Sequence, residues 1–130
     1  MACSLRIGDN VYISHRACIS CIDAVVIENN CVLSDDVYIA DSAHGYDPQN
    51  GPIMKQPLTS KGPVCIGEGS FLGCRTVVMP GVTLGAHCVV GCNSEVVRSF
   101  PAYFMLVGSS ARRIKTYSFE QRCWQPVKED

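Results

Sequence analysis

The chain of 130 residues lacks a long hydrophobic run, since none of its apolar stretches approaches the roughly 18 residues of a membrane-spanning helix. It also lacks a basic excess: 11 Lys and Arg stand beside 12 Asp and Glu, which argues against nucleic acid as the main partner. Residues 1–6 do not have the form of a secretory signal. A net charge of −1 with 47% hydrophobic residues argues against disorder. We therefore expect a single soluble, cytoplasmic domain over residues 1–130, with no membrane partner.

Cysteine is the residue type that the chain has in excess, with nine copies at positions 3, 18, 21, 31, 65, 74, 88, 92 and 123. An odd count without a secretory leader argues against a disulfide framework. Cys18 and Cys21 have the C-x-x-C spacing of a zinc site, but no second pair of ligands completes it. We expect free thiols packed as small hydrophobic residues and no bound metal.

A six-residue period organises the sequence. In the C-terminal half, aliphatic residues recur without a gap at Ile66, Leu72, Val78, Leu84, Val90 and Val96. Small or branched residues recur four positions after them, at Ser70, Thr76, Val82, Cys88 and Ser94, and Phe100 ends the series. The N-terminal part repeats the aliphatic pattern at Ile7, Ile13, Ile19 and Val25 and, after a shift of two residues, at Ile27, Leu33 and Ile39. Ordinary alternating strands predict period two, so they do not explain this spacing.

Six residues make one short strand and a turn with one aliphatic side chain pointing inward, and three such units close a triangular coil of about 18 residues. Repeats of this length are typical of a parallel β-helix, so we expect an all-β fold. The predicted coils are 7–24, 27–44, 66–83 and 84–101. Cys74 and Cys92 would stack on successive coils within possible reach of a disulfide, although a reducing cytoplasm favours thiols.

Two segments depart from the period. Residues 45–63 are rich in Pro and Gly and contain no aliphatic hexad, which predicts a long loop leaving the coil between N-terminal coils (5–44) and C-terminal coils (64–101). Residues 102–130 form a cap or tail, since the repeat stops there and a solenoid needs a cap. Within this cap, Ala111 to Trp124 is predicted to be a short helix or an extended tail.

Several ordered motifs carry a specific resemblance. They are Ile39–Asp47 (IADSAHGYD), Gln56–Gly67 (QPLTSKGPVCIG), Met79–Gly85 (MPGVTLG), Val89–Ser94 (VVGCNS), Ser99–Tyr103 (SFPAY) and Gly108–Ala111 (GSSA). Together they make residues 5–124 similar to the hexapeptide-repeat O-acetyltransferases that modify sugars and polysaccharides. The resemblance implies a left-handed β-helix, a homotrimer with active sites between neighbouring subunits, acetyl-CoA as acyl donor and a sugar hydroxyl as acceptor.

Acetyl transfer to an alcohol needs a base for the hydroxyl proton, and imidazole suits that task near neutral pH. Of the three histidines, His15 and His87 fall inside regular hexads and are predicted to be surface or packing residues. His44 precedes the long loop and matches the family's histidine motif, so we expect it to be the general base. Asp41 is a candidate to orient its imidazole, or is a solvated turn residue.

We assign acetyl-CoA binding to residues of the C-terminal coils and tail: Gly73, Gly91, Cys92, Ala111, Arg112, Arg113 and Lys115. Gly73 and Gly91 are 18 residues apart, so they stack on one edge, where backbone N–H groups are available to carbonyl groups of the donor. The same glycines are needed for coil geometry. The basic residues suit the CoA phosphates, with a solvated basic tail as the alternative.

Two other functions remain open from the sequence. A metal-dependent hydratase of the γ-carbonic-anhydrase type needs three suitably spaced histidines, and the spacing of His15, His44 and His87 does not match. A non-catalytic trimeric module would keep the repeat without an acceptor pocket, because a fold alone does not determine function.

Overall fold

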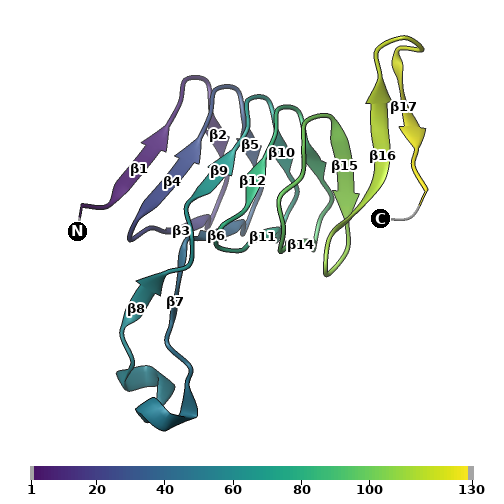
Figure 1. Ribbon diagram of the computed structural model, residues 1–130. Coiled ribbons are helices and arrows are strands. Elements are labelled where there is room, and N and C mark those ends of the chain that lie inside the picture. Colours follow the sequence, from purple (N-terminus) through teal and green to yellow (C-terminus); the bar gives the residue numbers. More distant parts are fainter. Residues whose placement is uncertain (1, 129–130) are drawn as a thin grey trace.

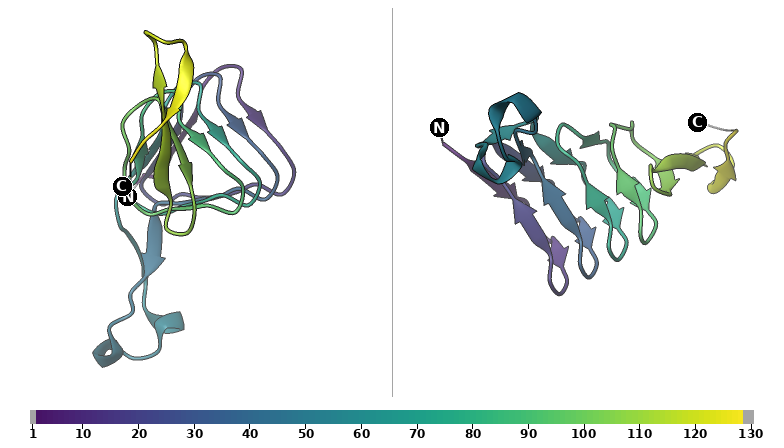
Figure 2. Two further views of the ribbon diagram at one scale, coloured as in Figure 1. Left: turned by 90° about the vertical axis from the view of Figure 1, so that its right-hand side faces the viewer. Right: turned by 90° about the horizontal axis from the view of Figure 1, so that it is seen from below.

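The structure is a computed structural model that describes residues 2–128. Short strands stack in parallel along three sides of a triangular prism, which Figure 2 shows in an end-on view. Each coil contributes one strand to each side, so equivalent strands of successive coils pair in parallel. The parallel β-helix predicted from the six-residue period is confirmed.

Four coils follow one another along the axis in Figure 1. The first side contains β1 (Ser4–Ile7), β4 (Ala24–Ile27), β9 (Val64–Ile66) and β12 (Thr83–Leu84). The second side contains β2 (Tyr12–Ile13), β5 (Val32–Leu33), β10 (Phe71–Leu72) and β13 (Val89–Val90). The third side contains β3 (Cys18–Ser20), β6 (Tyr38–Ala40), β11 (Val77–Val78) and β14 (Glu95–Val96).

The core is built from the predicted positions of the repeat. The six aliphatic residues of the C-terminal frame are all fully buried: Ile66, Leu72, Val78, Leu84, Val90 and Val96. The small or branched residues four positions later are also buried. The hydroxyl groups of Ser70, Thr76 and Ser94 bond to the neighbouring coil or to the cap. Ser70 Oγ donates to the carbonyl of Gly85 at 3.2 Å, which satisfies a polar group inside an apolar column.

The first coil is two residues longer than the third. Ile7 pairs with Ile27, 20 residues further on, whereas equivalent residues of the third and fourth coils are 18 apart. The additional residues lie in the corner at 21–23, so the frame shift occurs before Val25 and not after it. Val25 is a second inward residue of β4 and is fully buried beside Ile27.

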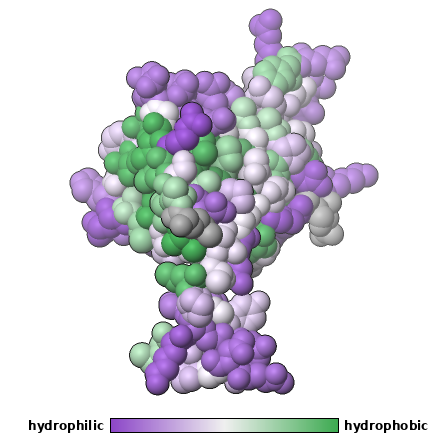
Figure 3. All heavy atoms as spheres, turned by 60° about the vertical axis from the view of Figure 1, so that its left-hand side comes forward, coloured by the Kyte–Doolittle hydropathy of each residue, from purple (hydrophilic) through white to green (hydrophobic). Residues whose placement is uncertain are grey.

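The end face of the prism that the first coil forms is apolar. Leu5, Ile7, Tyr12 and Ile13 are all exposed, and Figure 3 shows apolar side chains gathered at this end of the solenoid. Ile7 and Ile13 fall in the predicted core frame but are not covered, because no other coil of residues 2–128 lies against that side. None of the helices in the described part of the chain is long and apolar enough to cross a membrane.

The predicted loop leaves the prism at one corner without interrupting the stack, since Ile27 of β4 still pairs with Ile66 of β9. Strands β7 (Ser42–His44) and β8 (Leu58–Ser60) pair antiparallel and form a stalk. Two short 3-10 turns, Pro48–Asn50 and Ile53–Lys55, form its tip, which projects away from the prism in Figures 1 and 2. The stalk begins before residue 45, so the second coil ends earlier than the predicted range 27–44.

The C-terminal cap is a set of strands. β15 (Phe104–Val107) pairs in parallel with β13, and β16 (Arg112–Ser118) and β17 (Cys123–Pro126) extend the second side antiparallel. The short helix that the sequence allowed within Ala111 to Trp124 is therefore wrong, and the extended alternative is right. β-Branched and aromatic residues such as Ile114, Thr116 and Tyr117 favour a strand, and the open edge of β15 offers it backbone partners.

Candidate active site

His44 lies on the stalk, at the end of β7, with an exposed imidazole. Its Nδ1 lies 2.7 Å from the backbone carbonyl oxygen of Gln56 on the other side of the stalk. A carbonyl oxygen only accepts hydrogen bonds, so this contact places the imidazole proton on Nδ1. Nε2 is then left with a lone pair that can accept a proton, which is the form that a general base needs.

Gln56 organises the fold of the loop around this contact. It is only 6% exposed, and its Nε2 donates to the carbonyls of Asp47 and Gly51, at 2.8 Å each. A Cβ at Gly45 would lie 2.5 Å from Gln56 Oε1, so the chain beside His44 packs closely on this side chain. The sequence analysis missed Gln56, because an uncharged amide in a Pro- and Gly-rich segment gives no chemical signal.

Asp41 does not orient His44, and that expectation is corrected. Its side chain is fully buried at the base of the stalk, where its oxygens accept the backbone N–H groups of Ile22, Asp23 and Ala24 at 2.8–3.2 Å. Burial disfavours the charged carboxylate, but these hydrogen bonds outweigh it and lower the pKa of Asp41. Asp41 therefore closes the longer corner of the first coil, and the carbonyl of Gln56 takes the place beside the imidazole.

The returning strand of the stalk is also attached to this corner. Ser60 Oγ donates to Asp23 Oδ2 at 2.9 Å, and the N–H group of Lys61 donates to the carbonyl oxygen of Asp41 at 2.9 Å. Both strands of the stalk are thus bonded to the first two coils. This attachment fixes where the loop leaves the prism and, with it, the position of His44.

Gly73 and Gly91 stack on the second side as expected, and Cys92 is exposed beside them. Their own N–H groups are not available to a ligand, because Gly73 donates to Val90 at 2.8 Å and Gly91 to Leu106 at 2.9 Å. A Cβ at Gly73 would lie 2.8 Å from the backbone nitrogen of Cys92, so coil stacking itself requires a glycine there. At this edge, the N–H group of Cys92 has no backbone acceptor among residues 2–128.

The predicted donor-binding residues of the tail lie at β16. Ala111 is buried, and its N–H group donates to Glu95 at 2.7 Å. Arg112 is exposed, Lys115 is half-buried, and the guanidinium of Arg113 lies 5.0 Å from the ring centroid of Phe104. Figure 1 places this strand at the C-terminal end of the solenoid and the stalk below its N-terminal half, so a single chain does not bring His44 together with these cations.

The other two histidines lie at corners of the prism. His15 Nδ1 is 3.5 Å from Asp35 Oδ1, and the ring of His87 stacks on Tyr103 with centroids 5.7 Å apart. Among the residues that the structure describes, no group of three or more His, Cys, Asp or Glu side chains is placed to hold a metal ion.

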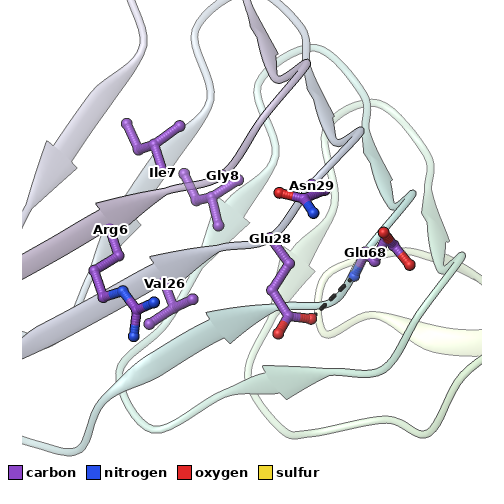
Figure 4. Close-up of a pocket in the computed structure, with 8 residues that line it drawn as sticks. Arg6, Ile7, Gly8, Val26, Glu28, Asn29 and Glu68 are labelled. Carbon is purple, nitrogen blue, oxygen red and sulfur yellow. Dashed lines mark hydrogen bonds between the residues drawn. The ribbon is translucent and has the colours of Figure 1, made fainter.

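Two hollows accompany the first coils and the loop. One, of about 450 Å³, is formed by the loop itself beside the stalk, where Tyr46, Gln56 and Lys61 line it. The other, of about 400 Å³, lies at the end of β1 and β4 and is shown in Figure 4. There Glu28 accepts the N–H group of Glu68 at 3.2 Å. Neither hollow was predicted from the sequence.

Comparison with family models matches both halves of the solenoid. Residues 66–98 match a family described as "Bacterial transferase hexapeptide (six repeats)", and residues 4–40 match "Hexapeptide repeat of succinyl-transferase". The matched ranges lie on either side of the stalk, in agreement with the coils of the structure.

Similar proteins include several that are named as acetyltransferases. The chain is 32% identical over 124 residues to the "Putative lipopolysaccharide biosynthesis O-acetyl transferase WbbJ" of Escherichia coli, covering 91% of the chain and 63% of the relative. A galactoside acetyltransferase in complex with coenzyme A superposes with a TM-score of 0.80 at 22% identity, over 97% of this chain and 67% of that one. An acetyltransferase of Vibrio cholerae complexed with acetyl-CoA gives 0.79 at 23% identity, over 86% and 60%.

The solenoid and its loop thus define a hexapeptide-repeat β-helix protein. The chain belongs to the hexapeptide-repeat family, and relatives that it resembles are named as acetyltransferases. It spans less than two thirds of the length of three curated relatives that it matches, covering 63%, 39% and 56% of them.

Proposed function

We propose that the protein transfers an acetyl group from acetyl-CoA to a hydroxyl group of a sugar or saccharide, with His44 as the general base. The observation that carries this proposal is the hydrogen bond from His44 Nδ1 to the carbonyl of Gln56, at 2.7 Å. It leaves Nε2 of an exposed imidazole as a proton acceptor, on the loop that the family resemblance assigns to the active site. Similar proteins named for lipopolysaccharide and galactoside chemistry support a saccharide acceptor.

In this proposal, His44 carries out both proton transfers of the reaction. Nε2 of His44 takes the proton of the acceptor hydroxyl as its oxygen attacks the thioester carbonyl carbon. The carbonyl of Gln56 holds the ring in place and stabilises the imidazolium that results, as an acceptor on the opposite nitrogen does in other histidine bases. When the tetrahedral intermediate collapses, the carbon–sulfur bond breaks and the imidazolium returns the proton to the departing thiolate.

We propose that acetyl-CoA lies along the second side of the prism, at Gly73, Gly91 and Cys92, and reaches the cations of β16. The N–H group of Cys92 is a donor for a carbonyl of the pantetheine arm. We assign exposed Arg112 and half-buried Lys115 to its phosphates. Ala111 contributes through its backbone carbonyl only, because its N–H group is already used.

We further propose that the active protein is a homotrimer. The base and the donor-binding residues lie on different parts of one chain, so a complete site needs the loop of one subunit beside the solenoid of another. The loop tip carries exposed apolar side chains, with Tyr46 72% and Met54 83% accessible, which a neighbouring subunit would cover.

Nine cysteines without a disulfide among the described residues fit a reducing cytoplasm.

The decisive experiment measures acetyl transfer to a panel of sugars with His44→Ala, using mass spectrometry of the acetylated product. Thiol-release assays are unsuitable, because the protein supplies nine thiols of its own. We expect His44→Ala to lose about 10²- to 10⁴-fold in kcat while calorimetry still detects acetyl-CoA binding. His15→Ala is the matched control, since that imidazole lies on a corner of the first coil, and it should retain activity.

Full turnover by His44→Ala would refute the assignment of the base. Binding of acetyl-CoA by the wild type without transfer to any acceptor would favour the non-catalytic module instead. Light scattering tests the assembly independently, with three times the chain mass of 14.1 kDa as the expected value.

A further inference from the structure

A pocket of about 260 Å³ lies at the C-terminal end of the solenoid, on the corner between the first and second sides. It is lined by His87, Tyr103, Tyr117, Phe119 and Trp124. These residues come from the corner of the fourth coil, the corner that follows it and the hairpin of β16 and β17. The predicted catalytic and donor-binding residues do not include any of them.

The rings are held at fixed angles to one another. Tyr103 and Phe119 meet edge to face at 4.9 Å and 89°, and Tyr117 meets Trp124 at 5.4 Å and 76°. Such pairs favour one arrangement, because the positive edge of one ring faces the negative face of the next. Phe119 nevertheless stays 64% exposed. The cluster is therefore an ordered aromatic surface that is open to solvent.

This surface is not part of the buried core. The core cluster consists of buried residues of the coils and the cap, with Val11, Ile19, Cys21 and Phe104 packed against it, and none of the five pocket residues belongs to it. A fixed group of aromatic side chains outside the core, two of them exposed and three half-buried, is a feature of binding sites.

The chemistry of the lining suits a ring with an apolar face and a polar edge. Among the residues that the structure describes, no Asp, Glu, Lys or Arg side chain lines the pocket, so it offers no charged side chain of these types to pair with a phosphate. The electron-rich faces of Tyr, Phe and Trp rings attract weakly positive C–H groups, and the Tyr, His and Trp side chains add polar tips at the rim. A pyranose ring has both features: a face of C–H groups and a perimeter of hydroxyls.

We propose that this aromatic pocket binds a pyranose unit of a saccharide acceptor, at a distance from the unit that receives the acetyl group. The acceptor class rests on the proposed function. The stalk and the terminal hairpin project in opposite directions in the left view of Figure 2. The pocket is therefore remote from His44 of the same chain and takes no part in the proton transfer there. Its role is to hold the acceptor. It raises the affinity for long saccharides and leaves single sugars unaffected at the reacting site.

The chain reports occupancy of the pocket directly, because Trp124 is its only tryptophan. The intact protein is titrated, without acetyl-CoA, with methyl β-D-galactopyranoside and with a β-linked galactose tetrasaccharide, and tryptophan fluorescence is recorded. We expect a saturable change with both and a lower Kd for the tetrasaccharide. Phe119→Ala should weaken binding about three- to tenfold, the effect of one aromatic contact.

Two variants serve as controls. Tyr12→Ala removes an aromatic side chain that is 61% exposed on the first coil, and it should bind as the wild type does. Phe119→Leu keeps an apolar side chain but loses the ring face, so it should also weaken binding. This variant replaces Phe119→Ala in the test if Phe119→Ala is poorly folded. Thermal unfolding of each variant is measured in parallel.

The proposal is overturned if neither saccharide changes the fluorescence, or if both Phe119 variants bind as the wild type does. It is also overturned if adenosine 3′,5′-bisphosphate saturates the same signal and displaces the sugar, because the pocket would then belong to the acyl donor. Transfer to short acceptors without saccharide binding here would overturn this proposal alone. Saccharide binding without any transfer would overturn only the proposed activity.

Discussion

The carbonyl oxygen of Gln56 and Nδ1 of His44 lie 2.7 Å apart across the stalk of the loop. The same Gln56 residue uses its side chain to hold two backbone carbonyls of the loop tip, at 2.8 Å each. One buried residue therefore couples the conformation of the loop to the orientation and tautomer of the proposed base. Residues that shape the loop should thus affect turnover without touching a substrate.

Substitution of Gln56 tests this coupling. Gln56→Ala leaves the carbonyls of Asp47 and Gly51 without their donor and frees the segment whose carbonyl orients His44. We expect kcat for acetyl transfer to fall about 10- to 100-fold, as small displacements of a catalytic group do, with little change in acetyl-CoA affinity. Gln49→Ala, at an exposed position of the tip, is the matched control. Unchanged kcat in Gln56→Ala would show that the loop holds His44 by other means.

Asp41 gives the fold a defined dependence on acid. Its pKa is lowered in the folded state, since three backbone N–H groups stabilise the carboxylate despite its burial. Its contribution to stability is therefore present above the ordinary carboxyl pKa of about 4 and is lost as pH falls through the lower folded value. We expect the melting temperature of the wild type to decrease below about pH 4, and Asp41→Asn to show a shallower decrease.

Asp41→Asn should also be less stable at neutral pH. Loss of charge-assisted hydrogen bonds typically costs about 1.5–3 kcal/mol in the free energy of unfolding. Asp36→Asn is a useful control, because the pKa of Asp36 is also lowered, by Arg16, but on the surface. An Asp41→Asn protein as stable as the wild type would contradict the role of this carboxylate in the corner.

The inward residues of the second side predict that the same truncation costs a different amount of stability in different coils. Ile13, Leu33 and Leu72 occupy equivalent positions in register, but Leu33 is fully buried whereas Ile13 is 36% exposed. Leu33→Ala should lower the free energy of unfolding by about 2–5 kcal/mol, since it leaves a cavity. Ile13→Ala should cost only about 1 kcal/mol, because solvent already reaches it. Urea unfolding measures both, and equal losses would mean that the first coil is covered.

The repeat predicted the core because each six-residue unit turns one aliphatic side chain toward the interior. The spacing of these residues therefore identifies the inward positions. Ile66, Leu72 and their successors are buried wherever a coil lies on both sides. Where a neighbour is missing, as at Ile7 and Ile13, the identical pattern gives exposed residues. Periodicity therefore indicates which way a side chain points and does not indicate what covers it.

The site was harder to predict than the core. His44 was proposed as the base from a motif and from its place before the loop, and its role stays a prediction. Its backbone partner Gln56 could not be found, because a carbonyl oxygen carries no sequence signal. Asp41 was assigned to His44 from its spacing in the chain, but carboxylates satisfy the nearest unpaired donors, and these are the N–H groups of the longer corner at 22–24.

The thiols of Cys3 and Cys21 provide a last test, on the first coil. Their sulfur atoms lie 3.1 Å apart without a disulfide, and Cys74 and Cys92, the pair suggested from the repeat, are free thiols as well. Burial, together with the neighbouring Cys3, raises the pKa of Cys21 to about 11. Since only the thiolate reacts, we expect iodoacetamide at pH 8 to label Cys21 far more slowly than exposed Cys92, and its rate to rise about tenfold per pH unit. Peptide mass spectrometry over a pH series measures this, and equal rates at pH 8 would mean that Cys21 is not held in the corner beside Cys3.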